Sequence, residues 1–248
     1  MKRVQMFLAG AFIAVGALYA QSSDAEWQAE VAKLKGTIQT NPAQAAEEAE
    51  HLIKGKNKKN VELLVAIGNA YLDADKLPEA QEYATLARKA NGKSALASDL
   101  QFQVGRLYYG AGTQPDSLTI TVEERKQALM SADSVFHAIA EAAPDNYLGN
   151  FWRARANSAL DPETTQGLAK PFYEEVAALL ESKNDPHYNS ALVECYSYLG
   201  YYYLLAIENP ALKAEAKANK DKSIEYWNKI LAIDPANATA KRALDGIK

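Results

Sequence analysis

The chain has 248 residues, of which 48% are hydrophobic and 23% charged, and this composition excludes a long disordered or low-complexity protein. Its formal net charge is −4, and no basic domain or stripe accompanies that acidic balance, which argues against nucleic acid as a partner. The length suits one sizeable domain or a short array of repeats.

The first 20 residues predict a secretory signal peptide. "MKR" is a short basic start, "VQMFLAGAFIAVGALYA" is apolar except for Gln5, and "QSSDAEW" returns to polar sequence. We expect cleavage near Ala20, with Ala17 as a second candidate, and therefore an exported protein of the periplasm or cell envelope. The alternative is an uncleaved membrane anchor, since residues 4–20 reach the lower limit for crossing a bilayer.

Residues 61–94 carry the clearest repeat pattern in the chain. A first apolar set is followed by the breakers of "DADKLPEA" and then by regularly spaced alanines. The positions concerned are Leu64, Ile67, Gly68 and Tyr71, then Ala80, Ala84 and Ala87. Similar sets recur in the same order, and their members are Val104, Gly105, Tyr108, Ala132, Phe136 and Pro144, then Leu199, Gly200, Tyr203, Ser223, Trp227 and Pro235.

This order resembles the tetratricopeptide repeat (TPR), whose pattern is W-x2-L-G-x2-Y, then A-x3-F, then P. The resemblance covers roughly residues 27–248, and "NFWRARANSALDPETTQGLAKPFYEE" (150–175) is similar to stretches common in exported bacterial TPR proteins. It implies an all-α fold: a right-handed solenoid of antiparallel helical hairpins, some with elongated helices. Stacked hairpins bury one continuous core, and small residues at the eighth repeat position let two helices approach closely.

We therefore expect a single TPR solenoid domain over residues 21–248. The expected repeats are 27–60, 61–94, 98–146, 147–189 and 193–237, followed by a capping helix at 238–248.

Two of these repeats contain insertions with their own helix signals. Thr121 and Glu124 have capping-box spacing and predict a long helix that ends near residue 142. Asn209 and Pro210 fit an N-cap and a first helical position, and predict a second long helix from 210 to about 233. The segment "GAGTQPDSLTI" (110–120) predicts a loop.

Five of the eight residues from Tyr196 to Tyr203 are tyrosine. At 100° per residue, Tyr196 and Tyr203 point at the partner helix, whereas Tyr198 and Tyr202 point towards a neighbouring repeat. Tyr201 alone points towards the expected groove. The cluster is therefore interpreted mainly as core and not as an aromatic ligand box.

The sequence gives no indication of an enzyme, a cofactor site or a metal site. His51, His137 and His187 lie on separate repeats, and none has a second ligand at metal spacing. Cys195 has no nearby histidine to activate it and is expected to be a small buried residue. As the only cysteine, it permits neither an intramolecular disulfide nor a lipid anchor near the N-terminus.

In TPR arrays, positions 2, 5, 9 and 12 of the first helix commonly line the concave face. The resemblance therefore implies a partner-binding groove formed by Asn69, Phe102, Arg106, Tyr109, Phe151, Arg155 and Tyr201. Its two arginines resemble the carboxylate clamp of some TPR domains, although the lysine positions of that clamp are not matched. Alternatively, Arg106 and Arg155 pair with nearby acids inside the array.

The favoured function is an exported scaffold that binds a protein or peptide in this groove, through an acidic segment or a free C-terminus. One alternative is a structural subunit of a cell-envelope assembly, associated without a lipid anchor. Another is a glycan-binding protein that uses exposed aromatic residues.

Overall fold

A computed structural model describes residues 24–115 and 120–247, and eleven α-helices lie in this part of the chain. The expected signal peptide, residues 1–20, lies outside the described residues. None of the described helices combines the length and the apolar character needed to cross a membrane.

The first four helices form two pairs. They are α1 (Asp24–Thr40), α2 (Pro42–Leu52), α3 (Val61–Asp73) and α4 (Leu77–Ala90). The Asn41 and Asn60 side chains cap α2 and α3 by accepting hydrogen bonds from backbone N–H groups of the first turn. Asp75, in the breaker segment between α3 and α4, adopts a left-handed conformation with φ 57°. The polar residues between the apolar runs therefore set where these helices begin and end.

The third pair consists of α5 (Ala95–Gly112) and α6 (Val122–Ala142). The expected capping box is confirmed: the Thr121 hydroxyl accepts from the Glu124 N–H at 3.2 Å, and the Glu124 carboxylate accepts from the Thr121 N–H at 2.7 Å. These bonds from Thr121 hold the pKa of Glu124 below its ordinary value. The expected loop at 110–120 begins too early, because α5 continues to Gly112. A Cβ atom at Gly112 would lie only 2.5 Å from Leu129 Cγ, so this last turn packs directly on α6.

The remaining helices are α7 (Leu148–Leu160), α8 (Lys170–Lys183), α9 (Asn189–Glu208), α10 (Ala216–Ile233) and α11 (Ala238–Gly246). The expected start of a helix at residue 210 is wrong, since the 3₁₀ turn η3 (Pro210–Glu215) precedes α10. None of residues 212–215 is buried, whereas Asn219, Ser223 and Trp227 of α10 are. Tertiary packing supplies most of the stability of a helix. Residues 212–215 lack such packing, and α10 therefore begins only after the 3₁₀ turn.

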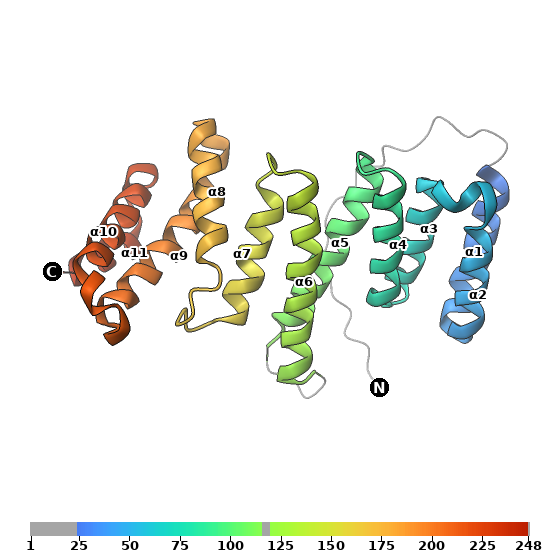
Figure 1. Cartoon of the computed structure of the whole chain (residues 1–248), viewed down its shortest axis with the longest axis horizontal. Coiled ribbons are helices and arrows are strands. Elements are labelled where there is room, and N and C mark those ends of the chain that lie inside the picture. Colours follow the sequence, from blue (N-terminus) through green and yellow to red (C-terminus); the bar gives the residue numbers. More distant parts are fainter. Residues whose placement is uncertain (1–23, 116–119, 248) are drawn as a thin grey trace.

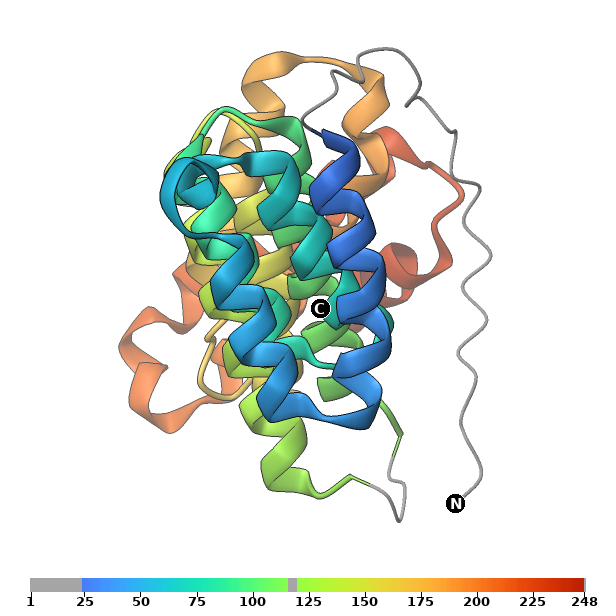
Figure 2. The ribbon, with the colours of Figure 1, turned by 90° about the vertical axis from the view of Figure 1, so that its right-hand side faces the viewer.

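The helices follow one another along the long axis of the molecule, from α1 and α2 at one end to α10 and α11 at the other (Figure 1). Viewed along that axis, they stack one behind another (Figure 2). The two members of each pair pack together, and α4, α6 and α8 each also pack on the first helix of the next pair. The protein is thus an all-α, TPR-like solenoid of helical hairpins with one further helix, α11.

Close contacts explain why small residues recur in the helices. A Cβ atom at Gly200 would lie 2.7 Å from Trp227 Cε2, and one at Gly105 would lie 2.8 Å from Phe136 Cε1. At Gly149, at the start of α7, it would lie 2.6 Å from the backbone nitrogen of Ala140 in α6. Large side chains fill the space that glycine leaves, as close packing requires.

The tyrosines of α9 show the predicted division between core and surface. Tyr196 and Tyr203 are buried, with 4% and 5% exposure, Tyr198 and Tyr202 are half-buried, and Tyr201 is 44% exposed. Cys195 is fully buried, as expected, and burial raises the pKa of its thiol.

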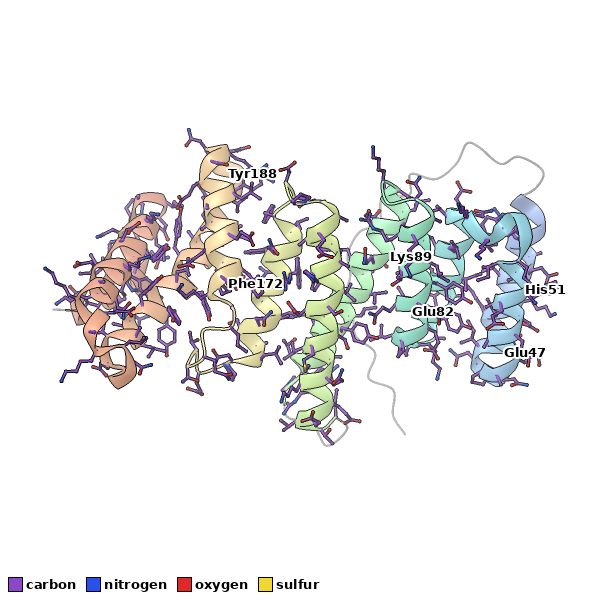
Figure 3. The ribbon with its side chains drawn as sticks, in the orientation of Figure 1. Glu47, His51, Glu82, Lys89, Phe172 and Tyr188 are labelled. Atoms are coloured by element: carbon purple, nitrogen blue, oxygen red, sulfur yellow. The ribbon has the colours of Figure 1, made fainter. Side chains whose placement is uncertain are left out.

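The buried residues divide into an N-terminal core, chiefly from α1 to α5, and a C-terminal core from α7 to α11. A small third cluster, containing Phe136 and packed against Phe102 and Trp152, lies between them. Figure 3 labels the side chains of Glu47 and His51 on α2, at the N-terminal end of the array.

Candidate functional site

Aromatic side chains from three helices meet where the two cores join. We define this central aromatic cluster as Phe102 and Tyr109 of α5, Phe136 of α6 and Trp152 of α7. The Trp152 ring stacks on Phe136 with centroids 5.5 Å apart, and it meets Phe102 and Tyr109 edge-on at 5.8 and 5.4 Å. Stacked and edge-on contacts are the favoured aromatic geometries, so these rings hold one another in place.

Two arginines approach this cluster, and they differ in their partners. The Arg106 guanidinium carbon lies 5.6 Å from the Trp152 ring centroid, its side chain is exposed, and no acidic side chain in the described part of the chain pairs with it. Arg155 lies 4.7 Å from the same ring, but its Nε and Nη2 atoms donate to the two carboxylate oxygens of Glu194, both at 2.7 Å. The bonds to Glu194 raise the pKa of Arg155. Arg155 therefore pairs inside the array, whereas Arg106 keeps its donors available.

The other residues expected in the groove take up different positions. Phe151 is buried in the C-terminal core, where its ring lies 6.3 Å from that of Tyr173. Asn69 is half-buried on α3, and Tyr201 is exposed on α9. Among the described contacts, none joins Asn69 or Tyr201 to the central aromatic cluster.

Sequence reasoning did not identify Trp152, which is the residue that organises this site. The groove positions taken from the TPR pattern include Phe151 but do not include Trp152, which is the next residue. The "FWRAR" segment did contain a usable signal, because Trp152 and Arg155 are three residues apart and share a helix face.

The C-terminal core contains three polar contacts of one kind, in which a glutamate accepts from a tyrosine hydroxyl and from a cation. We call them the tyrosine–glutamate sets. They consist of Tyr173, Glu194 and Arg155; Tyr196, Glu181 and Lys229; and Tyr203, Glu174 and Lys170. The three hydroxyl oxygens lie 3.1, 2.8 and 2.8 Å from their carboxylate acceptors.

The electrostatics of the Glu181 set show how such a contact is maintained. Partial burial acts to raise the pKa of Glu181, but hydrogen bonds from Lys229 and Tyr196 outweigh it and lower that pKa. Burial of Tyr196, together with its bond to Glu181, raises the pKa of the phenol. Glu181 is therefore an anion in this set and Tyr196 a neutral donor, as a charge-assisted hydrogen bond requires.

Within residues 24–115 and 120–247, no three histidine, cysteine or acidic side chains come together in a group able to hold a metal ion. The three histidines lie on α2, on α6 and in the turn η2 (Pro186–Tyr188).

Comparison with known proteins finds a similarity to a solved structure. No family model matches the chain, and a search of curated proteins finds no match. Among solved structures, the chain is similar to the C-terminal part of a TPR repeat-containing protein from Cytophaga hutchinsonii. That similarity has 25% sequence identity and a TM-score of 0.41, and it covers 88% of this chain and 99% of the other. At that TM-score it adds no weight to the description of the fold, which follows from the pairing of the helices.

Proposed function

We propose that this chain is an exported, non-catalytic scaffold that binds a protein partner at the central aromatic cluster, through a carboxylate taken up by Arg106. One observation supports this most directly: Arg106 is an exposed guanidinium beside Trp152, without an acidic partner among the described residues. The neighbouring Arg155, by contrast, donates two hydrogen bonds to the Glu194 carboxylate.

The chemistry of the guanidinium indicates the partner. A planar guanidinium presents paired N–H donors that match the two oxygens of a carboxylate. Contact with an aromatic ring holds it in place without consuming those donors. The proposed ligand is therefore an acidic side chain or the free C-terminus of a protein.

Reversing the charge of Arg106 tests this proposal. We expect Arg106→Glu to abolish capture of the partner from the native envelope fraction, as followed by mass spectrometry, and to leave helicity and melting unchanged. Arg242→Glu is the matched control, because Arg242 is exposed on α11, away from the aromatic cluster. Undiminished capture by the Arg106 variant would exclude this site.

Export is a separate part of the proposal, and it is supported by the basic start and apolar run of residues 1–20. N-terminal sequencing of the native protein should begin at Gln21, or at Leu18 for the second cleavage point. An intact Met1 on a membrane-embedded chain would contradict cleavage.

A further inference from the structure

A second candidate site lies at the other end of the C-terminal core. A cavity of 380 Å³ opens between the loop that joins α7 to α8, the second half of α9 and the turn η3. Tyr201 and Leu205 line it, with exposures of 44% and 37%, and they lie one helical turn apart on α9. Both belong to the small group of exposed large hydrophobic side chains among the described residues. We call this cavity the Tyr201 pocket.

The loop that forms one wall of the pocket is held rigidly. The buried Asp161 carboxylate accepts hydrogen bonds from the backbone N–H groups of Thr165, Gln166 and Gly167, at 2.8–3.0 Å. Gly167 has φ 67°, and a Cβ atom there would lie 2.5 Å from a ring carbon of Tyr202. The loop thus packs directly on α9, and the wall exists before any ligand arrives.

The charges at the pocket are of one sign. Glu163 on the loop and Glu208 at the end of α9 line it, both are exposed, and neither forms an ion pair with a described residue. No basic side chain is among the described lining residues. Lys170, whose Nζ lies 5.8 Å from the Tyr202 ring centroid, is outside the lining and bonded to Glu174 at 3.1 Å.

We propose that the Tyr201 pocket binds a short segment of a partner protein in which a lysine or arginine neighbours an apolar side chain. The apolar side chain would cover Leu205, and the cation would lie over the Tyr201 ring between the two glutamates, where ring and carboxylates both attract positive charge. The volume is at the small end of the range for ligand pockets, about 300–1,000 Å³, which suits a few side chains and not a folded domain. This site is independent of the carboxylate site at Arg106.

The test uses the full chain and a set of amidated, N-acetylated hexapeptides. In one series an arginine or lysine flanks leucine or phenylalanine, and in the matched series the neutral residue glutamine replaces the basic residue. We expect fluorescence anisotropy to detect binding of the basic series only, with an affinity that weakens as salt is added. Equal binding of both series, or of neither, would overturn the proposal.

Variants then locate the binding. Glu163→Gln combined with Glu208→Gln should weaken binding of the basic peptides by roughly tenfold, because two exposed charge contacts are lost. The control combines Glu47→Gln with Glu62→Gln, which removes the same charge from exposed positions on α2 and α3 and should leave binding unchanged. Equal losses in the two double variants would assign the binding to net charge and not to the pocket.

Exposed apolar positions provide a second comparison. Leu205→Ser should weaken binding of the basic peptides, whereas Leu96→Ser, at a 49% exposed position on α5, should not. Sedimentation of the wild-type chain tests the competing occupant. If the wild-type chain forms a concentration-dependent dimer that Leu205→Ser loses, the occupant of the Tyr201 pocket is a second copy of this chain and not a partner segment.

Discussion

The two ends of this solenoid are built from the same helical hairpins, but they are held together differently. In α1 to α4, aliphatic and small side chains fill the core, and the stacked rings of Tyr71 and Tyr83 form no hydroxyl hydrogen bond with a described residue. From Tyr147, which directly precedes α7, to the end of α11, nine of the 14 tyrosines gather, and three of them donate to glutamates on a neighbouring helix.

The difference shows two ways to fix one helix against the next. Apolar burial is non-directional, so it stabilises any arrangement of the two helices that fills the volume between them. A hydrogen bond between a phenol and a carboxylate has a required distance and direction, so it also selects the register of the two helices. The C-terminal core therefore depends in part on the ionisation of its glutamates. The N-terminal core depends on apolar packing, and the ion pairs Lys33–Glu48 and Lys35–Asp73 join its helices at the surface.

The largest expected effect comes from the junction between the two ends. Gly149→Ala would place a methyl group against the Ala140 backbone, which cannot rotate away, and we expect it to destabilise the protein by about 1–3 kcal/mol. At Gly68 the nearest atom is Leu100 Cδ2, at the end of a flexible side chain. Gly68→Ala should therefore change stability by less than about 1 kcal/mol, since helix propensity offsets the strain. Chemical denaturation followed by circular dichroism measures both, and equal losses would contradict the close approach of α6 and α7.

The next effect concerns the tyrosine–glutamate sets directly. Tyr196→Phe removes the hydroxyl that lies 2.8 Å from Glu181 and should cost about 1 kcal/mol of unfolding free energy. Tyr83→Phe is the matched control in the N-terminal core, where no described residue accepts from the hydroxyl, and it should be nearly neutral. If both variants lose the same stability, the two ends are not held differently.

The smallest effect is a pH dependence at the C-terminal end. The pKa of Glu181 is lowered in the folded state, so the stability it contributes is present above its ordinary value of 4.5 and is lost as the pH falls through the lowered value. Glu181→Gln should thus lower the melting temperature by roughly 1–2 °C near neutral pH, a small change because the side chain is 41% exposed.

The comparison of Glu181→Gln with the wild type should be repeated in acid below the lowered pKa of Glu181, where both chains carry a neutral side chain at this position and their melting temperatures should converge. Glu47→Gln on α2, at an exposed position without a described ion pair, should show no such convergence. A difference for Glu181→Gln that is the same at both pH values would contradict the role given to its charge.

Part of the candidate site was accessible from sequence. Repeat spacing selected Phe102, Arg106, Tyr109 and Arg155, which the structure does bring to Trp152. Spacing could not say which arginine is free, because Glu194, the partner of Arg155, lies 39 residues further along the chain. Trp152 itself was missed because its importance comes from rings on α5 and α6 that meet it only after folding.

The sequence by itself determined the all-α hairpin architecture, the capping box of α6 and the faces of the α9 tyrosines, because these depend on helical periodicity and on contacts within a few residues. Only the tertiary structure decided that α10 begins after a 3₁₀ turn, that the core has two differently built ends, and that Arg106 has no acidic partner among the described residues. Each of these depends on which side chains from distant helices come within contact distance, and neither periodicity nor local capping specifies that.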